Sequence, residues 1–178
     1  GAGAAGLIAA LTAVRCGAEV ILLESTRDGG RKILISGGGR CNILPSVAQP
    51  DRYVTDSSPN TLRKMLRSWP LQEQRDFFER ELEVTLELEE ESGKLFPSTH
   101  RARDVRDGLV RRVTEAGARI WFEARVTALR RQDDAWSVDI DGSSPTPIHT
   151  PNSPASRRRS RSTPRVRARR SAPRVDSS

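Results

Sequence analysis

The chain contains only two cysteines and no long apolar run, and each of these absences excludes a class of protein. Cys16 and Cys41 are too few for a disulfide framework, and they do not form a metal-ligand pattern. No segment approaches the roughly twenty consecutive apolar residues of a membrane-spanning helix, and no charged start followed by an apolar core marks a signal peptide. We therefore expect a protein of the reducing cytoplasm, without a metal site and without a membrane partner.

Acidic residues are almost absent from one part of the chain, residues 143–178. That segment has nine arginines, no lysine and a single acidic residue, Asp176. Residues 1–142 hold 21 basic and 22 acidic side chains, although the whole chain carries a net charge of +7. We expect residues 1–142 to form one near-neutral domain, and the high overall charge indicates nothing about its partner.

The same segment also has few large apolar side chains. It contains six prolines and nine serines among its 36 residues, with Ile148, Val166 and Val175 as its main apolar groups. Such a composition cannot bury a core, so we expect residues 143–178 to be a disordered tail. The change of composition at Ser143 is abrupt, which favours a shifted reading frame over a genuine basic tail.

The chain begins with a G-x-G-x-x-G loop. Its candidate phosphate-binding residues are Gly1, Gly3, Ala4, Ala5 and Gly6. In a dinucleotide-binding unit the first two glycines permit a tight turn close to the pyrophosphate, and the third lets the next helix pack on the sheet. The alanine-rich residues 7–16 predict that helix, which Gly17 would end, and its free N–H groups would face the phosphates.

Residues 18–24 form a short apolar run that ends in a carboxylate. Val20 to Leu23 suit a parallel strand buried on both faces. Glu24 lies about twenty residues after the glycines, where an acid can accept hydrogen bonds from both ribose hydroxyls. The glycine loop, helix, strand and acid together predict an α/β fold, a Rossmann-like FAD/NAD(P)-binding domain with a parallel sheet.

A loop of this kind normally follows a buried strand, yet the chain begins at Gly1. We expect a fragment that is incomplete at both ends, because the tail stands where a further strand would close the sheet. Ordering an unanchored loop costs on the order of 1–2 kcal/mol per residue. We therefore expect this chain by itself to bind a dinucleotide weakly.

A second glycine-rich loop follows at residues 36–42. Its candidate cofactor-binding residues are Ser36, Gly37, Gly38, Gly39, Arg40, Cys41 and Asn42. Three consecutive glycines can form a nest of backbone N–H donors with little steric bulk. Arg31 and Lys32 add positive charge nearby. The segment predicts a contact for a phosphate, a ribityl chain or the edge of a flavin ring.

Together the two motifs resemble the YhiN-like family of FAD-binding flavoproteins, whose members include aminoacetone-oxidase-type and NAD(P)/FAD-dependent oxidoreductases. The long second motif, G-R-K-x-x-x-S-G-G-G-R-C-N from Gly30 to Asn42, carries the resemblance, which covers residues 1–142. It implies FAD-dependent oxidoreduction, with NAD(P)H as a candidate electron donor. It also implies pyrophosphate at the first loop, the adenosine ribose at Glu24, adenine near the backbone of Val126, and the remaining cofactor at Arg31, Lys32 and residues 36–42.

Three alternatives stay open. NAD suits the first loop as well as FAD does, because Glu24 fits either ribose, and only residues 30–42 favour FAD. Dithiol reductases share the G-G-R-C-N run but need a second cysteine five residues later, where this chain has Ser46, so we expect Cys41 to be a packed side chain. Nucleic-acid binding through the arginines of 157–170 is disfavoured, because the tail has no aromatic side chain for base stacking. No motif identifies the small-molecule substrate, a catalytic acid or base, or the oligomeric state.

The rest of the chain predicts regular elements around these motifs. Ser58 and Pro59 are typical of a helix start, and Gly117 of a helix end. Apolar periodicity predicts helices at 59–69, 72–80 and 102–116, a β-ribbon at 83–88 and 94–96, and strands at 119–123, 124–129 and 135–140.

Overall fold

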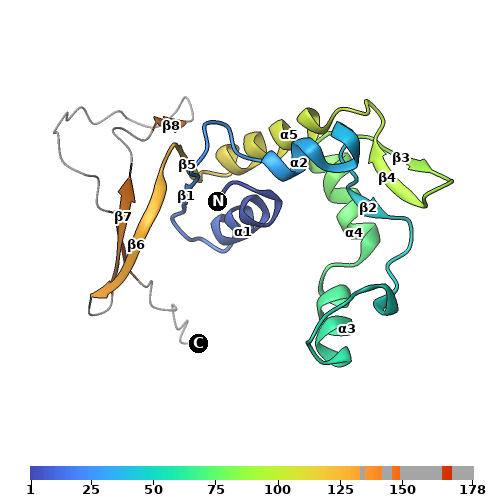
Figure 1. The fold of residues 1–178 in the computed structure, drawn as a ribbon, viewed down its shortest axis with the longest axis horizontal. Coiled ribbons are helices and arrows are strands. Elements are labelled where there is room, and N and C mark those ends of the chain that lie inside the picture. Colours follow the sequence, from blue (N-terminus) through green and yellow to red (C-terminus); the bar gives the residue numbers. More distant parts are fainter. Residues whose placement is uncertain (133–134, 142–145, 149–165, 170–178) are drawn as a thin grey trace, which may run out of the picture. The chain divides into compact units, whose positions relative to one another are not determined.

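The computed structural model describes residues 1–132, 135–141, 146–148 and 166–169, which fold as two compact units (Figure 1). The first unit comprises Gly1–Gly29 and Val113–Ser178, and the second comprises Gly30–Arg112. The sequence predicted one domain over 1–142. The division falls after Gly29 and within the last helix, between Arg112 and Val113.

The first unit contains the predicted helix and the parallel strand pair. Helix α1 (Ala4–Arg15) starts directly after Gly3 and ends before Gly17, whose positive φ of 82° suits glycine. Strand β1 (Ile21–Leu23) pairs in parallel with β5 (Arg119–Phe122), with Leu22 opposite Ile120. The fold is α/β and Rossmann-like, as the sequence predicted.

The core of the first unit lies between α1 and this sheet, where Leu7, Leu11 and Ile120 are buried. The residues of β1 are only half-buried, whereas the sequence predicted a strand buried on both faces. The reason is that β1 lies at the edge of the described sheet, whose strand order is β1-β5-β8.

The first unit also holds a twisted antiparallel hairpin, formed by the strands predicted at 124–129 and 135–140. It consists of β6 (Arg125–Gln132) and β7 (Ala135–Asp141), which appear side by side in Figure 1. A register shift between Val126 and Ala128 interrupts the pairing near the start of β6. Such irregularities re-aim the side chains beside them.

Two short strands occur in the segment predicted to be disordered. Strand β8 (Thr146–Ile148) pairs antiparallel with β5, and β9 (Val166–Arg169) pairs antiparallel with β7. For these residues the expectation of disorder was wrong, because backbone hydrogen bonds to an edge strand need no apolar side chains. The prediction for residues 142–145, 149–165 and 170–178 lies outside the described residues.

The second unit combines short helices with a β-ribbon. Helix α2 (Arg31–Ile35) leads into the 3-10 turn η1 (Ser36–Gly39), and strand β2 (Leu44–Pro45) pairs with β4 (Lys94–Pro97). The predicted ribbon is formed by β3 (Leu86–Glu89) and β4, with Glu89 opposite Lys94. A short 3-10 turn, η2 (Pro50–Arg52), follows β2.

The predicted helices of the second unit are present. Helix α3 (Pro59–Ser68) is capped by Ser58, whose side chain accepts a hydrogen bond from the Thr61 N–H at 3.2 Å. Helix α4 (Leu71–Asp76) continues as the π-helical turn η3 (Phe77–Glu81). Phe77 is buried, but no residue of α3 is, so its apolar stripe packs less deeply than the periodicity indicated.

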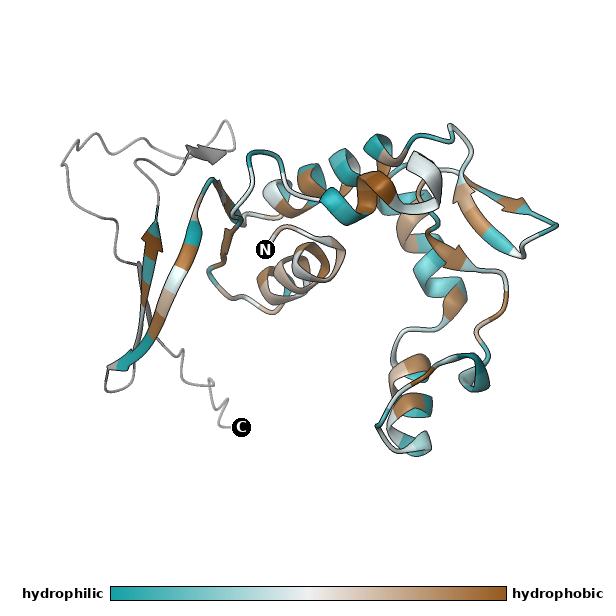
Figure 2. Cartoon of the chain, in the orientation of Figure 1, coloured by the Kyte–Doolittle hydropathy of each residue, from teal (hydrophilic) through white to brown (hydrophobic). Residues whose placement is uncertain are grey.

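Helix α5 (Ala102–Glu115) is amphipathic, and its colours alternate between hydrophilic and hydrophobic in Figure 2. Ala102, Val105, Leu109 and Val113 are buried along one side of it. This spacing of three and four residues is the pattern from which the helix was predicted. Among the described residues, no helix is both long enough and apolar enough to cross a membrane.

Candidate cofactor-binding site

The first glycine loop leaves the start of α1 open. Gly3 is the N-cap residue, its carbonyl accepts the Leu7 N–H at 2.9 Å, and no side chain caps the helix. The first N–H groups of a helix have no partner within the helix, and they attract anions. Gly3, Ala4 and Ala5 are exposed, and a Cβ placed on Gly3 would have no atom within 4 Å. There is therefore room for a phosphate at this end of α1.

Gly6 is required by the loop itself. A Cβ on Gly6 would lie 1.9 Å from the carbonyl oxygen of Gly1, whereas the Leu22 side chain on β1 would be 3.7 Å away. The sequence predicted that the third glycine lets the helix approach the sheet. The structure adds a tighter constraint, because the helix start folds back against Gly1.

Glu24 fastens the loop to the end of β1. One carboxylate oxygen, Oε2, accepts the buried backbone N–H of Ala2 at 2.6 Å. The other, Oε1, accepts the N–H of Thr26 at 2.8 Å and its hydroxyl at 2.7 Å. Since Thr26 supplies two donors to Oε1, the acceptor capacity left for a ribose lies mainly on Oε2.

These contacts also set the charge of Glu24. Burial alone would raise the pKa of this carboxyl group, but the hydrogen bonds from Thr26 and Ala2 lower it further than burial raises it, so its pKa lies below the ordinary value. Glu24 is buried to 7% exposure, and its carboxylate is ionised at neutral pH. A buried anion with one partly free oxygen suits a hydroxyl donor.

Thr26 is a site residue that the sequence reasoning missed. Its hydroxyl donates to Glu24 and accepts the N–H of Gly29 at 3.1 Å, while its carbonyl accepts the N–H of Glu123. A hydroxyl residue two positions after an acid at a strand end is the signal that could have identified it, because Ser and Thr bond to nearby backbone and side-chain groups.

A pocket of about 360 Å³ lies beside the first loop. It is lined by Gly1, Leu23, Ser25, Ala124, Arg125 and Val126. The start of the glycine loop and the segment at Val126, far apart in the sequence, therefore share one cavity. Val126 is 47% exposed, so an apolar surface is available to a ligand there.

The second glycine loop has an unusual backbone. Gly37, Gly38 and Gly39 have φ values of 55°, 67° and 88°, a left-handed region that strongly favours glycine. Above Gly38 a Cβ would have no atom within 4 Å. Arg31 and Lys32, at the start of α2, are exposed cations in the same unit.

Arg40 is engaged by the protein's own groups. Its Nη1 donates to Glu89 Oε1 at 2.7 Å, its Nε donates to the Gly37 carbonyl at 3.3 Å, and its guanidinium lies 4.3 Å from the centre of the Phe96 ring. The structure therefore ties Arg40 to the β-ribbon.

Cys41 is a packed side chain in the structure. It is 5% exposed, and burial raises the pKa of its thiol, an effect that a hydrogen bond with the Ser36 side chain partly offsets. Both cysteines are free thiols. Asn42, the next residue, is exposed. The burial of Cys41 agrees with the expectation that it performs no disulfide exchange.

The predicted cofactor residues thus divide between the two units. Gly1, Gly3, Ala4, Ala5, Gly6, Glu24 and Val126 belong to the first, and Arg31, Lys32 and the residues 36–42 belong to the second. Each unit contains a glycine with open space beside its backbone, Gly3 in the first and Gly38 in the second.

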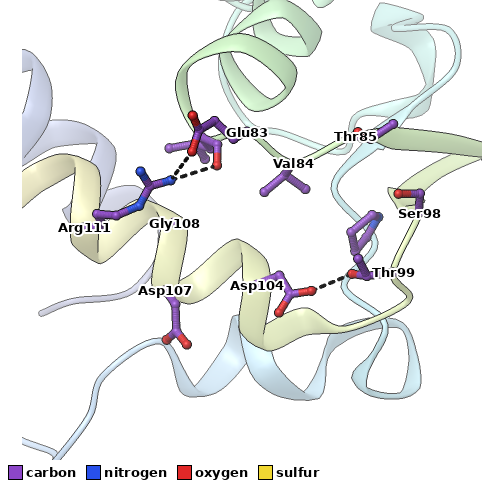
Figure 3. Close-up of a pocket in the computed structure, with 11 residues that line it drawn as sticks. Glu83, Val84, Thr85, Ser98, Thr99, Asp104, Asp107, Gly108 and Arg111 are labelled. Carbon is purple, nitrogen blue, oxygen red and sulfur yellow. Dashed lines mark hydrogen bonds and ion pairs between the residues drawn. The ribbon is translucent and has the colours of Figure 1, made fainter.

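A larger pocket, of about 480 Å³, lies in the second unit and contains none of these residues (Figure 3). Three carboxylates line it, and each has a partner: Glu83 with Arg111 at 3.1 Å, Asp104 with the Thr99 hydroxyl at 2.7 Å, and Asp107 with Arg106. In the described part of the chain no group of three or more metal-binding side chains occurs.

Curated proteins with similar sequences are much longer than this chain. The 3-dehydro-bile acid delta(4,6)-reductase of Clostridium scindens is 28% identical over 144 residues, which are 80% of this chain and 34% of that protein. The ribosomal RNA dihydrouridine synthase of Escherichia coli is 28% identical over 143 residues, 80% of this chain and 34% of that protein. The ribosomal RNA dihydrouridine synthase of Haemophilus influenzae is 30% identical over 132 residues, which are 74% of this chain and 32% of that protein. The chain therefore spans about a third of the length of these relatives.

A solved structure from studies of BexE and oxidation during BE-7585A biosynthesis is 19% identical to this chain. The alignment has a TM-score of 0.45 and includes 83% of this chain and 28% of the chain in that structure. The family model described as HI0933-like protein Rossmann domain matches residues 1–149. The resemblance to FAD-binding flavoproteins is confirmed by this match, and the chain belongs to the family of HI0933-like Rossmann domains.

Proposed function

We propose that this chain binds FAD and forms part of an FAD-dependent oxidoreductase. The first unit would hold the ADP half of the cofactor, with the pyrophosphate at the start of α1, the ribose at Glu24 and the adenine in the pocket at Val126. The second unit would bind the rest of the cofactor through Arg31, Lys32 and the open backbone of residues 36–42.

One observation carries the proposal. The start of α1 is uncapped and open at Gly3, while the ionised Glu24 is fixed 2.6 Å from the Ala2 N–H at the base of the same loop. Donors for a phosphate and an acceptor for a hydroxyl therefore lie at the same loop, although Glu24 is 22 positions away from Ala2 in the sequence. This combination fits the pyrophosphate and ribose of a dinucleotide.

Both glycine loops leave room for a cofactor. A Cβ at Gly3 or at Gly38 would meet nothing within 4 Å, so backbone atoms can be approached closely at both loops. When bound, FAD supplies hydride or electron transfer, and the protein supplies position and electrostatics. The chain's own task in this proposal is to bind and orient the cofactor, with NAD(P)H as the candidate electron donor of the complete protein.

The relatives support the reaction class. One relative is named a 3-dehydro-bile acid delta(4,6)-reductase and another a ribosomal RNA dihydrouridine synthase. We propose a redox reaction for the complete protein. We also propose the cytoplasm as its compartment, since both cysteines are free thiols.

The test is a titration of FAD with the purified chain, followed by flavin fluorescence. We expect saturable quenching that ADP reverses, because ADP would occupy the first unit alone. NAD⁺ that competes as strongly as FAD would instead favour the NAD alternative. Absence of saturable quenching up to millimolar protein would contradict the proposal.

A pair of variants makes the test specific. Glu24→Ala removes the ribose acceptor, and loss of one charge-assisted hydrogen bond lowers affinity by roughly tenfold or more. Glu19→Ala is the matched control, because the Glu19 side chain is 92% exposed and forms a surface ion pair with Arg119 at 3.3 Å. Equal FAD affinity in the Glu24 variant and the control would remove Glu24 from the site.

A further inference from the structure

The second glycine loop has one packed side and one open side. A Cβ on Gly37 would lie 2.8 Å from the Phe96 ring and 3.0 Å from the Asn42 N–H nitrogen. A Cβ on Gly38 would meet nothing within 4 Å. Gly37 therefore rests on the β-ribbon, and Gly38 presents its backbone to solvent.

Arg40 connects the packed side to the ribbon by three contacts. Its guanidinium bonds to Glu89 on β3, bonds back to the Gly37 carbonyl, and stacks on Phe96 of β4. Glu89 is held in turn by the Ser92 hydroxyl at 2.5 Å. The Arg40 and Glu89 side chains are 41% and 35% exposed, so this pair is partly shielded from water.

We propose that Arg40 is a positioning residue: with Glu89 and Phe96 it clamps the triple-glycine turn onto the β-ribbon, so that the open side at Gly38 faces the cofactor. The inference rests on the proposed function for its ligand. The clamp itself rests only on contacts within the second unit.

The clamp differs from the simpler reading in which Arg40 binds a cofactor phosphate directly. A substitution of Glu89 distinguishes these two roles of Arg40. If Arg40 bound a phosphate, neutralising Glu89 would leave more positive charge for the phosphate and binding would tighten. If Arg40 holds the loop, the same change loosens the loop and binding weakens.

The experiment compares Glu89→Gln with Glu87→Gln, a control on the same strand whose carboxylate faces His100 at 3.7 Å. FAD affinity is measured by fluorescence titration. A partly exposed ion pair contributes modestly, so Glu89→Gln should weaken FAD binding about threefold, and Arg40→Ala, which also loses the ring contact, about tenfold. The control should match the parent. Tighter or unchanged binding in Glu89→Gln would overturn the proposal.

A charge swap provides rescue. In Arg40→Glu combined with Glu89→Arg the ion pair can form again with reversed direction. If the double variant recovers at least half of the lost binding free energy for FAD, the result supports a clamp. A phosphate-binding Arg40 predicts no recovery, since position 40 would then be negative.

Hydrogen exchange without FAD separates this inference from the proposed function. Backbone amides of residues 36–42 should exchange at least threefold faster in Glu89→Gln than in the parent, with unchanged exchange in α5, since the clamp restrains local opening. Unchanged exchange in the loop overturns the clamp even if the parent binds FAD. Faster exchange in Glu89→Gln, together with a parent chain that fails to bind FAD, leaves the clamp in place and rejects the proposed function.

Discussion

The carboxylate of Glu24 accepts the backbone N–H of Ala2 at 2.6 Å, across 22 positions of sequence. This bond fixes the glycine loop to the end of β1. Glu24 therefore has a structural role in addition to the proposed ribose contact, and the two roles can be measured apart.

The hydrogen bonds of Glu24 make the free energy of unfolding depend on pH. Because the folded-state pKa of Glu24 lies below its ordinary value of about 4.5, its stabilisation is fully present above that value and is lost as the pH falls through the folded pKa. We expect Glu24→Gln to lower the free energy of unfolding by about 1 kcal/mol at pH 7, since a charged acceptor becomes neutral. Urea unfolding at pH 7, 5 and 3.5 should show that the difference in free energy of unfolding between parent and variant becomes smaller as the pH falls. A gap that widens with acid would contradict the assignment.

Thr26→Val should lower the stability of the protein, as Glu24→Gln does, because Thr26 is a hydrogen-bond partner of Glu24. Valine keeps the shape but removes the hydroxyl that donates to Glu24 and accepts from Gly29. We expect a loss of about 1–2 kcal/mol of stability, with weaker FAD binding, because the Gly29 N–H loses its partner. Thr26→Ser is the control and should stay close to the parent in both measurements. Similar losses in the two variants would show that the methyl group, rather than the hydroxyl, matters.

The two glycines of the first loop should respond differently to alanine. Gly6→Ala would place a Cβ 1.9 Å from the Gly1 carbonyl, so we expect a destabilisation of about 1–3 kcal/mol. Gly3→Ala meets no protein atom within 4 Å and should melt like the parent, yet it should bind FAD at least tenfold more weakly. Thermal denaturation and FAD titration measure the two effects. Normal FAD affinity in Gly3→Ala would show that the pyrophosphate does not approach this residue.

Cys41 should be chemically inert in the folded protein. Its burial raises the pKa of the thiol, so little thiolate forms at pH 8, whereas Cys16 is exposed. Iodoacetamide followed by mass spectrometry should show Cys16 alkylated first and Cys41 only after unfolding. Cys41→Ser should retain FAD binding and reduction of bound flavin by an added reductant. Preferential alkylation of Cys41, or loss of reducibility with flavin bound, would indicate a redox role.

Gly108→Ala should stabilise the second unit. Gly108 lies inside α5 (Figure 3). A Cβ on Gly108 would make ordinary contacts with Leu82, the nearest at 3.4 Å. Alanine in a helix interior is favoured over glycine by about 0.8–1 kcal/mol. The contrasting control is Gly30→Ala, where φ is +67° and the Cβ would lie 2.4 Å from the Arg106 side chain. Urea unfolding should show a higher free energy of unfolding than the parent for Gly108→Ala and a lower one for Gly30→Ala.

The local features of this protein could be read from its sequence. Helix α1, its end at Gly17 and the ribbon at Lys94–Pro97 were predicted because glycine, capping residues and apolar periodicity act over a few positions. The two glycine motifs also identified the family, since each needs particular residue types at fixed spacing. Spacing alone placed Glu24 at a strand end, where the structure has it.

What the functional side chains contact was decided by the tertiary structure. Arg40 was predicted as a cofactor residue from its neighbours in sequence, yet its partner Glu89 lies 49 positions away. Thr26 carries no motif and became visible only through its bonds to Glu24 and Gly29. The edge position of β1 and the division into two units likewise depend on which distant segments meet. Such contacts form when the chain closes long loops around a shared core, and a local pattern of residues does not specify the partner.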